Sequence, residues 1–257
     1  MASDTSKSKP LGVVILAAGK GTRMKNPDLA KVMYELQGRP MVDYVVDLGT
    51  KLQAQRILAV VGWQRQSVID HISTLFPNVE FIEQAEQLGT GHALMQTTSA
   101  LKEFTGDLLV LSGDVPLLTE KTAQALVGYH RTSEAVASIL TAELDDPTGY
   151  GRIVRNDDGS VQKIVEQKDA SKQETAIKEI NSGIYVFDKE KLFECLTLLT
   201  TRNAQGEYYL TDVFEFFWKR KWKVSAVKVL DAVEVMGIND IQQLELARSL
   251  MAARLGA

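Results

Sequence analysis

Short apolar runs alternate with amphipathic stretches along most of the chain. Residues 13–17 form a continuous run rich in β-branched side chains, which is typical of a strand buried on both faces of a parallel sheet. Similar runs predict further strands at 56–61, 79–82, 108–111 and 135–140. Helical spacing between them predicts helices at 41–52, 67–75, 90–101 and 119–130. Strands that alternate with helices in this way indicate a doubly wound α/β fold.

The regular alternation of predicted strands and helices ends after residue 143. Three strand-like segments, 152–154, 161–165 and 180–187, are separated by turn signals such as NDDG. The remaining elements are predicted at 189–199 (helix), 210–219 (helix), 223–229 (strand) and 241–250 (helix). We therefore predict one domain over 1–257, with one lobe at about 11–142 plus the C-terminal part and a β-rich lobe at about 143–230.

Composition and charge narrow the class of protein. The chain has 257 residues with 45% hydrophobic side chains, which is enough for a sizeable core. Its net charge of −4 argues against nucleic-acid binding as the main purpose. Cys195 is the single cysteine, so no internal disulfide can form, and three scattered histidines argue against a histidine metal site. The apolar run at 12–18 is too short to span a membrane and has no signal-peptide layout, so we expect no membrane partner and a cytoplasmic location.

The first predicted strand leads into LAAGKGTRMKNPDLAK, residues 16–31. Glycines after such a strand let backbone N–H groups approach a phosphate, and Arg23 and Lys31 would add positive charge. Two familiar loops do not fit, because Met24 stands where a dinucleotide-binding GxGxxG needs glycine, and Val14 stands where a P-loop needs its first glycine. A surface turn with solvated charges is the alternative.

Two more loops follow predicted strands. In SGDVP, Asp114 is placed as a natural Mg²⁺ ligand, or else as a turn or helix-entry aspartate. In QAEQLGTGHA, Gln84 can both donate and accept, which suits a pyrimidine edge, and Gly89 allows backbone contact. The alternative there is a helix cap with an incidental glutamine. Because the three loops would meet at one edge of the sheet, together they indicate a nucleoside triphosphate site.

Eight motifs occur in one order: GKGTRM, QLGTGHA, SGDVP, PTGYGRIVR, VEQKDA, EINSGIY, GEYYLTD and VMGIN. In this set the chain resembles the uridylyltransferase (pyrophosphorylase) domain of bacterial N-acetylglucosamine-1-phosphate uridylyltransferases, from residue 13 to about 250. The resemblance implies a three-layer, Rossmann-like nucleotidyltransferase fold with a mixed, mostly parallel sheet and a β-rich sugar-binding lobe. It also implies Mg²⁺-dependent transfer of uridylyl from UTP to N-acetylglucosamine 1-phosphate, which gives UDP-N-acetylglucosamine, a peptidoglycan precursor, and pyrophosphate.

The same resemblance assigns roles to particular residues. Arg23 and Lys31 would bind the triphosphate and stabilise charge as pyrophosphate leaves, and Asp114 and Asn239 would hold Mg²⁺. The sugar would contact Gly151, Glu166 and Asn181, for which solvated turn or strand-edge positions are the alternative. The nucleotide-binding set is Leu16, Ala17, Ala18, Gly19, Gln84, Gly89 and Thr90.

The chain departs from the family pattern in three places. Ala30 replaces a proline before the motif lysine, the NPDLAK loop is one residue longer, and SGD replaces YGD. The left-handed β-helix acetyltransferase domain of the family does not follow, so we expect a truncated piece or a naturally single-function enzyme, present as a monomer or weak dimer. Three other functions remain open: transfer to another sugar 1-phosphate such as glucose 1-phosphate, transfer from another nucleotide, or nucleotide-sugar binding without catalysis. A dehydrogenase is disfavoured by Met24.

Overall fold

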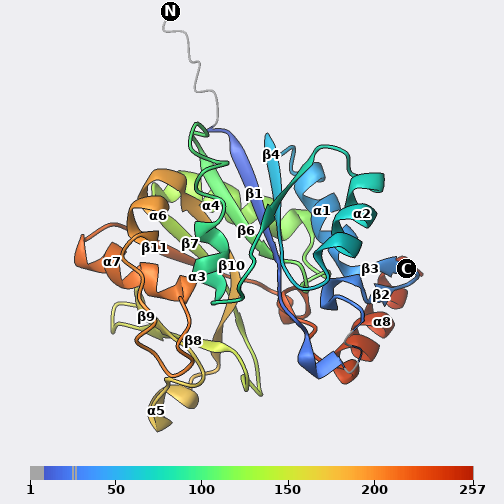
Figure 1. Cartoon of the computed structure of the whole chain (residues 1–257). Helices are drawn as coiled ribbons and strands as arrows, with labels where there is room; N and C mark the ends of the chain where they lie inside the picture. Colours follow the sequence, from blue (N-terminus) through green and yellow to red (C-terminus); the bar gives the residue numbers. More distant parts are fainter. Residues whose placement is uncertain (1–8, 25, 27, 257) are drawn as a thin grey trace, which may run out of the picture.

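A computed structural model describes residues 9–24, 26 and 28–256. Among these residues, nine strands form one sheet and two short strands form a separate hairpin (Figure 1). The strands of the sheet are β1 (Leu11–Ala17), β4 (Arg56–Val61), β5 (Val79–Glu83), β6 (Asp107–Ser112), β7 (Ala137–Glu143), β8 (Gly151–Arg155), β9 (Val161–Val165), β10 (Glu179–Asp188) and β11 (Val224–Lys228).

The main path of the sheet runs β11-β7-β10-β6-β1-β4-β5. Strand β1 is parallel to both β4 and β6, and β11 is parallel to β7, whereas β10 is antiparallel to both of its neighbours β6 and β7. Strands β8 and β9 extend from β10 as antiparallel additions. The predicted mixed, mostly parallel sheet is thereby confirmed.

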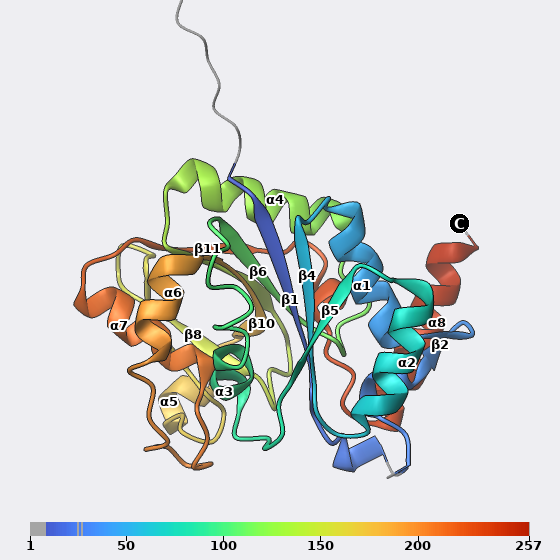
Figure 2. The same ribbon diagram turned by 45° about the horizontal axis from the view of Figure 1, so that its top comes forward.

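Helices cover both faces of the sheet. The helices are α1 (Met41–Lys51), α2 (Arg65–Leu75), α3 (Thr90–Met95), α4 (Glu120–Ser133), α5 (Lys172–Thr175), α6 (Lys189–Leu196), α7 (Val213–Lys219) and α8 (Ile241–Leu255). One buried cluster joins apolar residues of α1, α2 and α4 to one face, and a second joins α3, α6 and α7 to the other. Figure 2 shows α6 and α7 on the opposite side of the strands from α1 and α2. The fold therefore has the three layers that the sequence predicted.

A third, smaller core lies beside the sheet. Helix α8 packs on the hairpin β2 (Glu35–Leu36) and β3 (Arg39–Pro40) through a buried cluster that includes Leu244 and Met251. The Arg248 guanidinium also donates to the backbone oxygen of Glu35 over 3.0 Å. This hairpin was missed in the sequence, because its strands are only two residues long. None of the described helices combines the length and apolar character needed to cross a bilayer.

Several predicted helices have different bounds in the structure; for example, the helix predicted at 189–199 ends at Leu196, and the one predicted at 241–250 continues to Leu255. The helix predicted at 90–101 ends at Met95, where the chain tightens into turns with i→i−3 bonds, such as Thr97 N to Leu94 O at 3.0 Å. The helix predicted at 210–219 begins as a 3₁₀ turn, Leu210–Asp212, before α7 starts. The helix predicted from residue 119 does begin there, because the Thr119 side chain caps α4 by accepting a bond from Thr122 N.

A buried polar network ties α4 to β7 and β11. His130 is 3% exposed, its Nδ1 lies 2.9 Å from Ser138 Oγ, and Ser138 Oγ lies 2.6 Å from Ser225 Oγ. The His130 Nε2 lies 3.8 Å from the Asp107 carboxylate. These are the residue types of a hydrolase triad, but the network is enclosed, so its role is structural. Burial lowers the pKa of His130 below 6.5, although Asp107 opposes the shift.

Replacing His130 with glutamine is predicted to remove part of the pH dependence of stability. Between the lowered pKa of folded His130 and the ordinary value of about 6.5, the unfolded chain binds more protons, so stability is lost as the pH falls. Each unit of lowering corresponds to about 1.4 kcal/mol. Urea unfolding of both proteins at several pH values between 5 and 8 measures the difference. An identical pH slope in the two proteins would contradict this assignment.

Candidate active site

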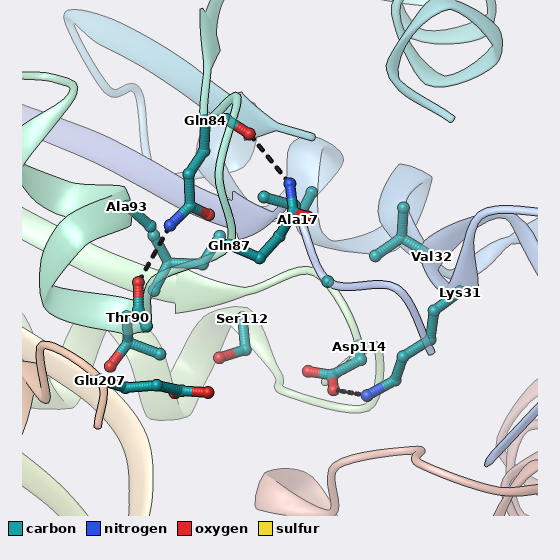
Figure 3. Close-up of a pocket in the computed structure, with 14 residues that line it drawn as sticks. Ala17, Lys31, Val32, Gln84, Gln87, Thr90, Ala93, Ser112, Asp114 and Glu207 are labelled. Carbon is teal, nitrogen blue, oxygen red and sulfur yellow. Dashed lines mark hydrogen bonds and ion pairs between the residues drawn. The ribbon is translucent and has the colours of Figure 1, made fainter. Parts of the chain in front are cut away.

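A cavity of about 310 Å³ opens at the carboxyl ends of β1, β5 and β6 (Figure 3). This is the edge at which ligands bind in open α/β sheets. Nine of the residues that the sequence singled out line it: Leu16, Ala17, Ala18, Gly19, Lys31, Gln84, Gly89, Thr90 and Asp114. Five further residues complete the lining: Val32, Gln87, Ala93, Ser112 and Glu207.

The loop after β1 exposes bare backbone to this cavity. The residue after the strand, Ala18, is buried, and its carbonyl accepts a bond from the backbone N–H of Trp63 over 3.3 Å. At Gly19, an added Cβ atom would meet no other heavy atom within 4 Å, so the space beside it belongs to the cavity. A loop of this kind can bring its N–H groups close to an anion.

Gly21 packs closely against the side chain of Lys31. Its φ is +61°, and an added Cβ atom would lie 2.6 Å from the Lys31 Cβ atom. Glycine is required here twice, once for the left-handed backbone and once for the close approach. The loop therefore closes directly on the stem of Lys31.

Lys31 joins Asp114 and Asn239 in one polar cluster. It begins the 3₁₀ turn η2 (Lys31–Met33), and its ammonium group forms an ion pair with Asp114 and donates to Asn239 Oδ1 over 2.7 Å. The Asp114 backbone oxygen accepts a bond from Ile238 N over 2.9 Å, which holds the segment of Asn239 in place. Ala30, in place of the family's proline, is buried and does not keep Lys31 from Asp114. Residues 25 and 27 of the longer loop lie outside the described residues.

The chemistry of this cluster suits a hard divalent cation. Carboxylate and amide oxygens of Asp114 and Asn239 already converge on one positive charge, the Lys31 ammonium group. In the part of the chain that the structure describes, no group of three or more His, Cys, Asp or Glu side chains could hold a metal. A two-oxygen site completed by phosphate oxygens and water is the arrangement that Mg²⁺ commonly adopts.

Gln84 forms a fixed polar wall of the cavity. It is 3% exposed, and its Nε2 donates to Gly89 O over 3.0 Å and lies 3.1 Å from His92 Nδ1. Its backbone N–H also donates to Val61 O over 2.8 Å, which ties it to the end of β4. The two side-chain contacts, of which the one to Gly89 O is drawn in Figure 3, orient the carboxamide before any ligand arrives, which suits selective hydrogen bonding to a base edge.

The QLGTG and GEYYLTD loops lock together through their backbones. Gly91 N donates to Tyr208 O over 2.8 Å, and Tyr208 N donates to Leu88 O over 2.8 Å. At Gly89, whose φ is +106°, an added Cβ atom would lie 2.6 Å from Tyr208 O, so a larger residue would separate the loops. This contact brings Glu207 to the wall of the cavity.

The three predicted sugar-contact residues lie together beside β10. Gly151 pairs with Asn181, and an added Cβ atom at Gly151 would lie 3.4 Å from Glu166 Oε2. Since β10 runs antiparallel to β6, its first residues lie at the edge of the sheet where β6 ends. Gly183 is accordingly close to Ser112, with 3.7 Å from an added Cβ atom to Oγ.

Glu166 also borders a second cavity of about 320 Å³, which includes Asp169, Thr211 and Asp212 in its lining. Its carboxylate accepts a bond from Thr211 Oγ1 over 2.9 Å. Burial raises the pKa of Glu166, and nearby Asp169 raises it further. Burial, together with Glu166 and other neighbouring carboxylates, raises the pKa of Asp212 to about 6. Acidic groups therefore gather on the β-rich side, opposite the basic Lys31.

Comparison with known proteins fits this geometry. A family model described as nucleotidyl transferase matches residues 12–232. The chain belongs to the nucleotidyl transferase family. It is 48% identical over 242 residues to the bifunctional protein GlmU of Latilactobacillus sakei subsp. sakei (strain 23K) and, equally, to that of Streptococcus mutans serotype c (strain ATCC 700610 / UA159). Each match covers 94% of this chain and 52% of the relative, so the chain spans about half the length of these curated relatives.

A solved structure has the same fold at low sequence identity. A UDP-glucose pyrophosphorylase complexed with UDP-glucose aligns with a TM-score of 0.74 at 15% identity, over 95% of this chain and 99% of that one. At this identity the likeness shows the fold alone, and it confirms the predicted α/β nucleotidyltransferase fold.

Arg23 is one of five predicted site residues outside the lining of this cavity, with Gly151, Glu166, Asn181 and Asn239. It is exposed on the 3₁₀ turn η1 (Thr22–Met24) and is not among the described residues that line the cavity. Its neighbour Met24 is buried, and the Met24 backbone oxygen accepts a bond from the Tyr34 hydroxyl over 2.6 Å. This bond anchors the turn that carries Arg23.

Three polar lining residues, Gln87, Ser112 and Glu207, were missed in the sequence. Each lies in one of the eight motifs that carry the resemblance, but none was itself singled out. Gln87 donates to the backbone oxygen of Gln84 over 3.0 Å, and Glu207 depends on the contact between two distant loops. Thr90 was expected near the nucleotide, and its hydroxyl also accepts a bond from Leu210 N over 3.2 Å. Their positions within these motifs were the signal that could have identified the three residues.

Gly21→Ala is predicted to weaken nucleoside triphosphate binding, because the new methyl group displaces Lys31. Gly38→Ala is a matched control: its φ is +75°, but an added Cβ atom would meet nothing within 4 Å. Both variants lose about 1–2 kcal/mol of stability from the positive φ. Calorimetric titration with UTP should show at least about tenfold weaker binding for Gly21→Ala only. Equal binding by the two variants would contradict the role of Gly21.

Proposed function

We propose that this chain transfers uridylyl from UTP to N-acetylglucosamine 1-phosphate, giving UDP-N-acetylglucosamine and pyrophosphate. One observation carries the proposal: a bare-backbone loop, the fixed Gln84 carboxamide and the Lys31–Asp114 ion pair meet around one cavity, and Lys31 also bonds to Asn239. The motif resemblance and the 48% identity to proteins named GlmU support it. A cytoplasmic location belongs to the same proposal, because UTP is a cytoplasmic metabolite.

Asp114 and Asn239 would hold Mg²⁺ in this reaction, together with phosphate oxygens of UTP. When bound, the ion neutralises phosphate charge and orients the reacting groups. The fit rests on the two oxygens that converge on the Lys31 ammonium group.

The protein's own groups would act mainly by positioning and by neutralising charge. Gln84 orients the uracil, while the backbone of Ala18 and Gly19 and the Lys31 ammonium group hold the triphosphate. A phosphate oxygen of the sugar 1-phosphate attacks the α-phosphorus of UTP in line, a new P–O bond forms, and the bond to the β-phosphate breaks to release pyrophosphate. Because the attacking oxygen is already anionic, no histidine or cysteine is needed as a base.

On the sugar side, Glu166 and Asn181 would bind hydroxyl and acetamido groups next to the backbone of Gly151. The Asn181 amide is buried and already donates to the Tyr185 hydroxyl over 2.7 Å, so its orientation is fixed. The Thr211 hydroxyl donates to the Glu166 carboxylate and so fixes the orientation of that side chain as well. A pre-oriented polar pair of this kind can reject sugars that lack a partner group.

Asp114→Asn is expected to lower kcat/KM for pyrophosphate release by about 100-fold or more, because a metal-binding charge is lost while the fold is kept. Asp28 is an exposed residue of the loop that precedes Lys31. Asp28→Asn therefore serves as the matched control and should retain wild-type turnover. A coupled pyrophosphate assay with UTP, Mg²⁺ and N-acetylglucosamine 1-phosphate measures both. Full activity of Asp114→Asn would remove the metal assignment.

Glu166→Gln is expected to raise KM for the sugar 1-phosphate by about 10- to 100-fold and to leave KM for UTP unchanged, because a charge-assisted hydrogen bond to the sugar is lost.

The same assay run with a panel of sugar 1-phosphates and nucleotides tests specificity. Faster turnover of glucose 1-phosphate would favour the alternative substrate. UDP-sugar binding without pyrophosphate release in any metal would favour a non-catalytic binding protein. Light scattering tests the expected monomer or weak dimer.

A further inference from the structure

We propose that the Lys31 ammonium group is a resident cation, which means that it occupies the candidate metal-binding position in the nucleotide-free protein. This protein therefore binds metal poorly, and the metal enters together with the nucleotide. The inference rests on the proposed function where it assigns Asp114 and Asn239 to a metal. It adds a competition between a side chain of the protein and that metal.

The geometry places the ammonium group on the candidate ligands themselves. Lys31 Nζ forms an ion pair with Asp114 Oδ2 and lies 2.7 Å from Asn239 Oδ1. The side chains of Lys31 and Asp114 are only 13% and 20% exposed, so water screens the contact weakly. The same two oxygens are therefore already satisfied by a positive charge.

Lysine and a divalent ion cannot share this position. Mg²⁺ needs its oxygen ligands at about 2.0–2.1 Å, and an ammonium group bonded to the same oxygens occupies that space. The two cations would also repel each other strongly at so short a distance. For the metal to bind, the ammonium group must leave Asp114 and Asn239.

The packing of Lys31 allows this movement within the side chain. Gly21 holds the stem at its Cβ atom, while the outer part of the chain extends along the wall of the cavity. A triphosphate bound on the bare backbone at Gly19 would offer the ammonium group a new set of negative oxygens. Nucleotide binding would then release the metal position and bring phosphate ligands to it at the same time. By linkage, the metal must raise nucleotide affinity by the same factor.

This mechanism gives Lys31 two opposite effects. If Lys31 only held phosphate, its removal would leave metal binding to the nucleotide-free protein unchanged. If it occupies the metal position, its removal strengthens that binding while it weakens the nucleotide reaction. The two effects can be measured separately.

The test is Mn²⁺ binding to nucleotide-free protein, followed by the electron paramagnetic resonance signal of the unbound ion. Lys31→Met removes the charge and keeps a stem of similar length against Gly21, and Lys31→Gln is a second variant. Both should bind Mn²⁺ at least about tenfold more tightly than the wild type. Lys20→Met, which removes an exposed lysine of the same loop, should match the wild type. The double variant Lys31→Met/Asp114→Asn should lose the gain.

The inference is overturned if neither Lys31 variant binds Mn²⁺ more tightly than the wild type, or if the gain survives in the double variant. Failure of the proposed function has a different signature. In that case the wild type releases no pyrophosphate from UTP and a sugar 1-phosphate, whatever the Mn²⁺ titrations show. If pyrophosphate release is normal but neither Lys31→Met nor Lys31→Gln binds Mn²⁺ more tightly, only the proposal that Lys31 occupies the metal position is contradicted.

Discussion

The contact of Lys31 with Asp114 and Asn239 is the interaction on which the site depends. It joins residues separated by 83 and 208 positions in the chain, from the loop after β1, the end of β6 and the segment before α8. Parallel pairing of β1 with β6 brings the first two together, and the bond from Ile238 N to Asp114 O brings the third. The cluster therefore forms only when the loops after β1 and β6 and the C-terminal part fold against each other.

The direction of β10 brings the two parts of the candidate site to one edge of the sheet. Because β10 is antiparallel to β6, Asn181 lies beyond the carboxyl end of β6, together with Gly151 and Glu166. The acidic, buried surroundings of Glu166 differ from the basic loop around Lys31. This separation suits a reaction between two phosphates, since one side attracts anions and the other can bind uncharged sugar groups.

The sequence predicted the fold closely because its buried strands are continuous apolar runs. The strand predicted at 56–61 matches β4, whereas the helix predicted from residue 90 ends six residues early, because i→i−3 turns replace it. Nine lining residues were found through motifs at strand ends, which topology gathers at one edge. The contact between Gly89 and Tyr208, which brings Glu207 to the cavity, joins loops 119 residues apart, and local patterns carry no signal of it. The motif also carries no signal that Arg23 is exposed on η1 and lies outside the lining of the cavity.

A structure with Mn²⁺ and a non-hydrolysable UTP analogue tests the central claim most directly, because anomalous diffraction locates the metal. The account predicts a peak bonded to the Asp114 and Asn239 side-chain oxygens, with the Lys31 ammonium group moved onto phosphate oxygens. A metal peak elsewhere, or Lys31 still between Asp114 and Asn239 while nucleotide and metal are bound, would contradict it.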